Sequence, residues 1–315
     1  MATVDTPVRT DTQAQGAPRQ DPPASGRQRW ARRLPLLPGL VYIIILTQIP
    51  FLFTLFYSFQ HWNLYRPGQR GFAGLENYRF VLGSPTFRTG ALNTVVLTAG
   101  AVLVALVLGL VLALLLNRAF RGRAVARTLL ITPFLVMPVA TALMWKNMVL
   151  HPVFGLWTFL MRPFFGTVDW VAQYPMAAII ATVAWQWTPF MMLILLAGLQ
   201  SQDEETMEAA RVDGAGPLAV FRYLTWSHLR PYAELGILLG SIFIVQTFDP
   251  IFIITQGGPG TATTNLPYFI YLQAFRALDI GQAAASAIVV VIATIVIATF
   301  ALRVMSNVFK LADYR

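Results

Sequence analysis

Few residues of this 315-residue chain are of types that carry out covalent chemistry. There is no cysteine, which excludes a thiol nucleophile, a disulfide and a thiolate-bound metal. The histidines, His61, His151 and His228, have no spacing typical of metal ligands. The two lysines, Lys146 and Lys310, do not lie in a glycine-rich phosphate loop. The sequence therefore predicts no catalytic residue, no metal site and no cofactor on this chain.

The remaining chemistry is non-covalent, and part of it lies inside long apolar segments. The polar and tryptophan residues there are Trp185, Gln186, Trp187, Gln246 and Asp249. Amides and carboxylates hydrogen-bond hydroxyl groups, and polar groups inside a membrane point to function by default. The alternative is structural, because glutamines also hydrogen-bond between helices and tryptophans also pack. We predict that these five residues line a path for a polar solute, with the structural alternative left open.

A second group of polar residues lies in the segment 200–232, where acids outnumber arginines. Ser201 and Glu204 have the spacing of a capping box. The helix that they begin is predicted to end near Val212, because Gly214 suits the left-handed conformation past a helix end. Pro217 suits the first position of a second short helix. One alternative is a linker on the membrane surface, but an acidic helix fits anionic headgroups poorly, which favours a protein partner.

The composition places these segments in a membrane protein. Hydrophobic residues make up 56 % of the chain and charged residues 12 %, with a mean hydropathy of +0.60. A soluble domain carries about twice that charge, so a soluble enzyme is excluded. Runs long enough to cross a bilayer as helices occur near Leu36–Phe59, Thr94–Leu116, Ala126–Val149, Met176–Leu199, Ala233–Ile254 and Ala283–Ala301. We predict an all-α, multi-pass protein with six transmembrane helices.

The charge distribution predicts how these helices are oriented. Residues 1–35 form a polar tail expected to be disordered, 36–310 a transmembrane domain, and 311–315 a C-terminal end. With six spans, 16 of the 23 basic residues fall on the side of both termini and of the loop 200–232. Cytoplasmic loops of membrane proteins carry an excess of Arg and Lys, so both termini are predicted to be cytoplasmic. The same excess accounts for the positive net charge, so no nucleic-acid partner is inferred from it. Lys146, near the outer end of a helix, is expected to extend outward.

The residues Glu208, Ala209, Ala210, Asp213 and Gly214 belong to the run EAARVDGA at 208–215. This run, between the fourth and fifth predicted spans, resembles the EAA loop of permease subunits of binding-protein-dependent ABC importers. The resemblance implies the type I importer permease fold. It also implies that these five residues dock on a separate ATPase subunit, which would hold ATP and magnesium. Trp226-Ser227 departs from the family pattern, which has Leu-Pro there.

A second motif, QGGPGTATTNL at 256–266, resembles a loop of carbohydrate permeases, although a simple Gly/Pro turn is the alternative. The segments at 151–157, 168–175 and 182–190 look most like the polyol (sorbitol/mannitol) branch. By resemblance the chain forms half of a carbohydrate path in the cell membrane. The implied partners are a second permease of different sequence, an ATPase dimer and an extracytoplasmic solute-binding protein.

Two other classes of membrane protein are alternatives to an importer permease. An ion-coupled secondary transporter of a small polar solute would need carboxylates within the membrane, and Asp249 is the clear candidate. Such a transporter often shows broken helices repeated in its two halves, and the sequence shows no obvious repeat of that kind. An intramembrane enzyme would need a catalytic cluster at depth, which the sequence lacks. The importer permease is therefore the preferred hypothesis.

Overall fold

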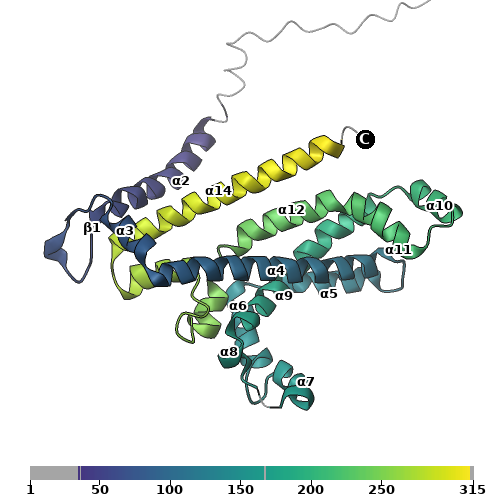
Figure 1. Cartoon of the computed structure of the whole chain (residues 1–315), viewed down its shortest axis with the longest axis horizontal. Helices are drawn as coiled ribbons and strands as arrows, with labels where there is room; N and C mark the ends of the chain where they lie inside the picture. The colour runs from purple at the N-terminus through teal and green to yellow at the C-terminus, as the bar shows by residue number, and fades with distance from the viewer. Residues whose placement is uncertain (1–34, 36, 167, 313–315) are drawn as a thin grey trace, which may run out of the picture. The chain divides into compact units, whose positions relative to one another are not determined.

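The computed structural model describes residues 35, 37–166 and 168–312 (Figure 1). Residues 1–34 of the predicted tail and 313–315 of the predicted C-terminal end lie outside these described residues. The chain divides into two compact units, Met1–Phe53 and Thr54–Arg315. Helix α2 (Leu37–Ser58) accounts for most of the described part of the first unit, and its last residues belong to the second.

The described part of the second unit is mostly helical, as the sequence predicts. Its two short strands, β1 (Gln60–His61) and β2 (Gly71–Phe72), pair antiparallel. Its longer helices are α4 (Pro85–Asn117), α5 (Arg123–Leu135), α7 (Leu156–Phe165), α9 (Pro175–Gln200), α10 (Glu204–Val212), α12 (Trp226–Ile244) and α14 (Ile280–Ala312). Shorter helical pieces are η2 (Pro67–Gln69), α3 (Glu76–Gly83), α6 (Pro138–Met144), α8 (Trp170–Gln173), α11 (Pro217–Ala219) and α13 (Leu266–Tyr271). Four segments are π-helical: η3 (Trp145–Val149), η4 (Val220–Thr225), η5 (Ile251–Thr255) and η6 (Leu272–Arg276).

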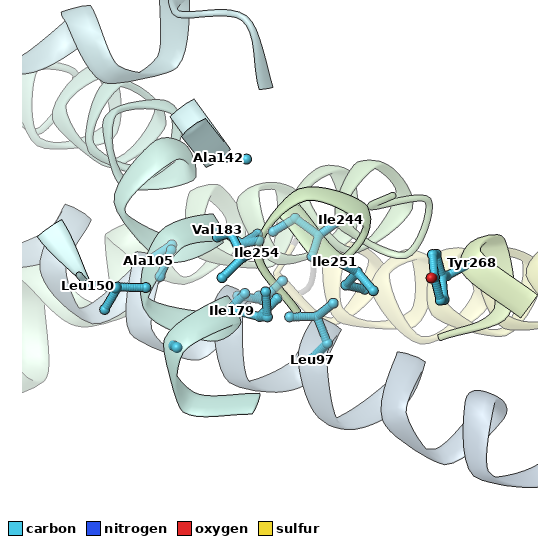
Figure 2. Close-up of a cluster of buried hydrophobic side chains, with 14 of the residues drawn as sticks. Leu97, Ala105, Ala142, Leu150, Ile179, Val183, Ile244, Ile251, Ile254 and Tyr268 are labelled. Atoms are coloured by element: carbon cyan, nitrogen blue, oxygen red, sulfur yellow. The ribbon is translucent and has the colours of Figure 1, made fainter. Parts of the chain in front are cut away.

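The core forms where α4 and α9 pack along each other, with α12 against both. Figure 2 shows its centre, where Leu97 of α4 meets Ile179 and Val183 of α9. Ile244 of α12 and Ile251 of η5 complete this cluster, so it joins elements far apart in the sequence. The same apolar side chains that predict membrane spans therefore also build the contacts between them.

Glycine permits the close crossing of α4 and α9. A Cβ atom on Gly109 would lie 2.7 Å from the Met191 Cβ and 2.9 Å from the Met192 backbone nitrogen. Helices in membranes approach this closely where one carries a small residue. At Gly100, one of the other contact points, an added Cβ would meet only the side chain of Ile180.

The third predicted span, Ala126–Val149, is not a continuous helix. Helix α5 ends at Leu135, and α6 with η3 continues from Pro138 after a bend of 98°. Val136 and Met137 are extended, with ψ of 137° at both. The residue before a proline is disfavoured in the helical region, which places the break immediately before Pro138.

The fifth predicted span, Ala233–Ile254, is also broken, and its helix begins earlier than predicted. Helix α12 starts at Trp226, directly after η4, and ends at Ile244. Residues 245–248 are not helical, and the chain resumes helical geometry at 249–255. The apolar run at 233–254 gave no sign of this interruption, because the break changes the backbone and not the hydropathy.

Three described helices are long and apolar enough to cross a membrane unbroken: α2, α4 and α9. The bent pair of α5 with α6 and η3 brings the number to four when it is counted as one span, and the described part of α14 adds a shorter apolar helix, Ile280–Ile295. Six spans remains a prediction. Helix α4 has 33 residues and begins at Pro85, before the predicted start at Thr94. It is longer than the ~20 residues that a bilayer core needs.

Replacing Gly109 by alanine should destabilise the packing of α4 on α9. Both Gly109→Ala and Gly100→Ala raise helix propensity equally, but only the Gly109 variant places its methyl group against backbone. We expect Gly109→Ala to lower stability by about 1–3 kcal/mol, as overpacking does, and Gly100→Ala to change it much less. The thermal unfolding midpoints of the two purified variants check this. Equal midpoints would contradict the close crossing.

Candidate functional site

Helix α10, in the acidic segment, begins at Glu204, but the predicted capping box is wrong. Asp203 is the N-cap: its Oδ1 accepts from the Glu205 amide at 3.1 Å, and its Oδ2 accepts from the Thr206 hydroxyl at 3.0 Å. Ser201 instead closes the last turn of α9, where its amide donates to the carbonyls of Ala197 and Gly198. The aspartate lies one residue before the helix and caps it, which leaves the serine hydroxyl for other partners.

The end of α10 agrees with the prediction. The helix ends at Val212, and Gly214 is left-handed with φ of 81°. The Ala215 amide then donates to the Ala210 carbonyl at 2.9 Å, which closes the helix end. Pro217 is the first residue of α11. The chain continues through η4 into α12, so Trp226-Ser227 lies in the first turn of a long helix and does not end one.

The outward side of this segment combines acids with apolar side chains. Glu208, Ala209, Asp213 and Gly214 are exposed, and Ala210 is half-buried. Val212 and Leu218 are 86 % and 79 % exposed, and Tyr223, five residues after Leu218, is also exposed. We call these eight residues the loop surface. Sequence reasoning missed its three large apolar members, because the acids dominate the segment's pattern.

The base of the segment is tied together by hydrogen bonds. The Ser201 hydroxyl lies 3.1 Å from His228 Nε2 and 2.8 Å from the Tyr232 hydroxyl. His228 Nε2 is also 3.1 Å from the Gly198 carbonyl. A Cβ on Gly198 would lie 2.7 Å from the Tyr232 ring, so α9 and α12 touch here. No role was predicted for His228, since this network depends on residues about 30 positions apart in the chain.

A pocket of about 360 Å³ lies beside the two broken spans. Four of the five predicted path residues line it: Gln186, Trp187, Gln246 and Asp249. Its other lining residues are Phe134, Val136, Pro138, Val183, Phe243, Thr247, Phe248 and Pro250. Trp185 is not part of the lining, and its ring instead meets Trp145 at a centroid distance of 6.0 Å. The structure thus brings together polar groups from α9 and from the break after α12.

The two glutamines of the pocket differ in what they bind. Gln186 is buried, and its Nε2 donates at 3.0 Å to the carbonyl of Val136 in the bend after α5. Gln246 is exposed, and its Nε2 donates at 3.2 Å to Ile242, one turn back along its own chain. Gln186 therefore has a structural partner across helices, whereas the Gln246 carboxamide makes only a local bond.

Aromatic side chains form one wall of the pocket. The Trp187 ring stacks on Phe243 at a centroid distance of 5.6 Å and an interplanar angle of 21°. Phe134 and Trp187 form a T-shaped pair with their ring centroids 5.4 Å apart. The pocket thus offers aromatic faces together with an amide and a carboxylate, which are groups that can pack against C–H surfaces and hydrogen-bond hydroxyls.

The glycine-rich motif at 256–266 is a hydrogen-bonded structure and more than a simple turn. Thr263, Thr264 and Asn265 are buried. The Thr263 hydroxyl bonds to that of Thr255 at 2.7 Å, and Thr264 donates to the Gly257 carbonyl at 3.3 Å. Asn265 caps α13 with its Oδ1, and its Nδ2 donates at 2.5 Å to the carbonyl of residue 247. The motif therefore fixes the break that lines the pocket.

Lys146 does not extend outward as expected. It is half-buried in η3, and its Nζ donates at 2.7 Å to the carbonyl of Ile253 in η5. A cation suits the carbonyls near the end of a helix, where backbone partners run out. Among the described residues, no group of three or more His, Asp or Glu side chains is placed to hold a metal ion.

Comparison with known proteins identifies the family. Residues 80–310 match the model of the inner-membrane component of binding-protein-dependent transport systems. The chain belongs to this family. It is 36 % identical over 252 residues to a probable ABC transporter permease of Sinorhizobium fredii, covering 79 % of this chain and 81 % of that protein. It is 33 % identical over 253 residues to the trehalose/maltose transport permease MalF of Thermococcus litoralis, covering 79 % and 83 %.

Similarity to a solved structure gives the fold class of the permease. The permease resembles a chain of a bacterial ABC transporter involved in the import of the acidic polysaccharide alginate, with a TM-score of 0.76 and 20 % identity. The match covers 89 % of this permease and 96 % of that chain. The predicted all-α, type I importer permease fold is thereby confirmed.

The left-handed Gly214 gives a matched test of the loop conformation. An added Cβ meets nothing within 4 Å at either Gly214 or Gly216, but only Gly214 has a positive φ. We expect Gly214→Ala to weaken the end of α10 by about 1–2 kcal/mol and Gly216→Ala to have little effect. Hydrogen–deuterium exchange of the α10 amides measures this. Equal exchange in both variants would refute the predicted strain.

Proposed function

We propose that this permease forms half of the path by which an ABC importer carries a carbohydrate, a sugar or a polyol, into the cell. The observation that carries the proposal is the pocket between the two broken spans, with its aromatic wall and its Gln246 and Asp249 side chains. Broken helices at membrane depth form solute sites in other transporters. The trehalose/maltose permease among its relatives supports a carbohydrate as the solute.

The loop surface is the proposed docking site for a separate ATPase subunit. Its acids and its exposed Val212, Leu218 and Tyr223 lie on a segment that joins two membrane helices. Exposed apolar side chains rimmed by polar ones mark protein interfaces. We propose that Glu208, Ala209, Ala210, Asp213 and Gly214 contact the ATPase. ATP and magnesium would be bound there and not on this chain.

The base of the loop gives this docking site a mechanical connection to the pocket. Ser201, His228 and Tyr232 join the end of α9 to the start of α12. Helix α9 carries Gln186 and Trp187, and α12 leads to Gln246. A displacement of the loop surface would therefore move both walls of the pocket. Alternating access follows when ATP and solute bind the two states with different affinities.

The remaining parts of the proposal concern partners and location. A second permease subunit would supply the other half of the path, and an extracytoplasmic solute-binding protein would deliver the solute. The protein would cross the cell membrane several times with both termini in the cytoplasm. The transmembrane domain would span 36–310, with the coupling loop at 200–232. The polyol branch is the narrower form of the proposal, supported by the segments quoted above.

Copurification tests the docking proposal. A tagged full-length chain should bring down an ATPase and a second multi-pass permease from membranes. Glu208→Ala should weaken recovery of the ATPase, and Gly214→Pro should abolish it, because proline cannot adopt a φ of 81°. Glu205→Ala, which removes an exposed acid of the same helix outside the proposed contact, is the control. A wild-type chain that purifies without an ATPase, yet transports solute on an ion gradient, would favour the secondary transporter and Asp249.

The two glutamines should separate solute binding from stability. Gln246→Ala removes an exposed amide from the pocket, so the solute KM should rise by roughly 2- to 10-fold, the effect of one hydrogen bond. The Gln246 bond to the Ile242 carbonyl is local and exposed, so the unfolding midpoint should stay close to that of the wild type. Gln186→Ala should lower the midpoint, because it leaves the Val136 carbonyl without its partner. Uptake of maltose, trehalose, sorbitol and mannitol by the wild-type importer identifies the solute. A Gln246 variant with wild-type KM for the transported solute would contradict the proposed site.

A further inference from the structure

Helix α7, Leu156–Phe165, exposes large apolar side chains along most of its 10 residues. Phe159 and Phe164 are 72 % and 78 % exposed. The other large apolar side chains exposed on it or just before it are Val153, Phe154, Leu156, Trp157, Leu160 and Phe165. Soluble surfaces rarely carry contiguous apolar patches of this kind, so the patch calls for a partner.

The helix is held to the protein by its opposite side. Thr158 is buried, and a Cβ on Gly155 would lie 2.5 Å from the His151 carbonyl oxygen, so the turn before α7 is tightly packed. Trp170 makes T-shaped ring contacts with Trp157 and Phe165 at centroid distances of 6.1 and 5.9 Å. These contacts fix which side of α7 faces away from the rest of the unit.

The position of α7 along the chain places it at one face of the membrane. It precedes α9, which is long and apolar enough to cross the bilayer, whereas the loop surface follows α9. With α9 crossing the bilayer, as the proposed function requires, the two lie at opposite membrane faces. Helix α7 itself spans only about 15 Å at 1.5 Å per residue, half of the hydrocarbon thickness, so it cannot cross.

The composition of α7 distinguishes a lipid partner from a protein partner. It has no acid and a single base, the exposed Arg162, and its exposed apolar residues include a tryptophan and several phenylalanines. Interfacial helices have this combination: aromatic rings sit at headgroup level, and a basic side chain meets the phosphates. A specific protein contact usually adds about one hydrogen bond per 100–200 Å², and the exposed apolar side of α7 carries few groups that could make one.

We propose that α7 lies flat in the lipid headgroup region of the membrane face opposite to the loop surface, with Phe159 and Phe164 inserted among the acyl chains. There it anchors the broken third span. Residues 150–155 connect it directly to η3, which follows α6, and Pro138 of α6 lines the pocket. The bilayer thus holds α6 and η3 at a fixed depth. Without this anchor, these two segments could move when the bend before Pro138 changes. This role does not depend on the identity of the solute.

Single-cysteine spin labelling tests this directly, because the native chain contains no cysteine. The full-length chain, purified with its accompanying subunits, would carry Phe159→Cys or Phe164→Cys and be reconstituted in phosphatidylcholine–phosphatidylglycerol vesicles. Thr158→Cys is the buried control and Gln69→Cys the exposed loop control. The labelled cysteine-free chain gives the background from the other subunits. Solute uptake by each variant shows that it is folded.

We expect labels at Phe159 and Phe164 to collide several-fold more with oxygen, and several-fold less with a water-soluble nickel chelate, than the label at Gln69. The label at Thr158 should be shielded from both. High nickel accessibility at Phe159 and Phe164 would place α7 in water and overturn the proposal. Shielding of both positions from both reagents would show a protein partner there, such as the second permease, and would overturn it equally.

Discussion

The structure depends on a constraint that lipid imposes on the backbone: every carbonyl and amide at membrane depth needs a partner within the protein. Two spans of this permease break, and side chains from elsewhere donate to carbonyls at or near the breaks. Gln186 binds Val136 in the third span and Asn265 binds residue 247 in the break of the fifth. Lys146 binds Ile253, which follows that break in the same predicted span. Losing one such bond costs about 1–3 kcal/mol, so the broken backbone depends on these three side chains for its stability.

The same constraint explains where the pocket lies. A continuous helix presents only side chains to its neighbours, whereas a broken one opens space and turns its chain aside. Here the bend at Val136 and the break at residues 245–248 both line the pocket, and α9 lies between them with Gln186 and Trp187. Gln186 thus helps to build the space that it lines. The sequence left open whether Gln186 has a structural role or contacts the solute. Its bond to Val136 holds the bend that lines the pocket, so the structural role is needed for the site to exist.

How much could be predicted follows from the range over which each signal acts. Apolar runs and the end of α10 are local: hydropathy marks the spans, and Gly214 with Pro217 marks the turn within a few residues. The break in the third span lies next to Pro138, so the sequence did contain a local signal for it. Hydropathy averaged over the whole span conceals that signal. The partners of Lys146 and Asn265 lie 107 and 18 residues away, and His228 meets Ser201 from 27 residues away. Such pairings exist only once the helices have packed, so no local pattern predicts them.

The two ends of α9 show how one helix can serve both membrane faces. At its C-terminal end Ser201 is tied to His228 and Tyr232, so in the proposed mechanism motion of the loop surface would pass to α9 and α12 together. At its N-terminal end the chain comes from α7 and α8, which the bilayer interface would hold at a fixed depth. A helix driven at one end and restrained at the other tilts more readily than it slides. Tilting would change the width of the pocket where Gln186 and Trp187 lie, and the proposed solute path would open by such a lateral displacement.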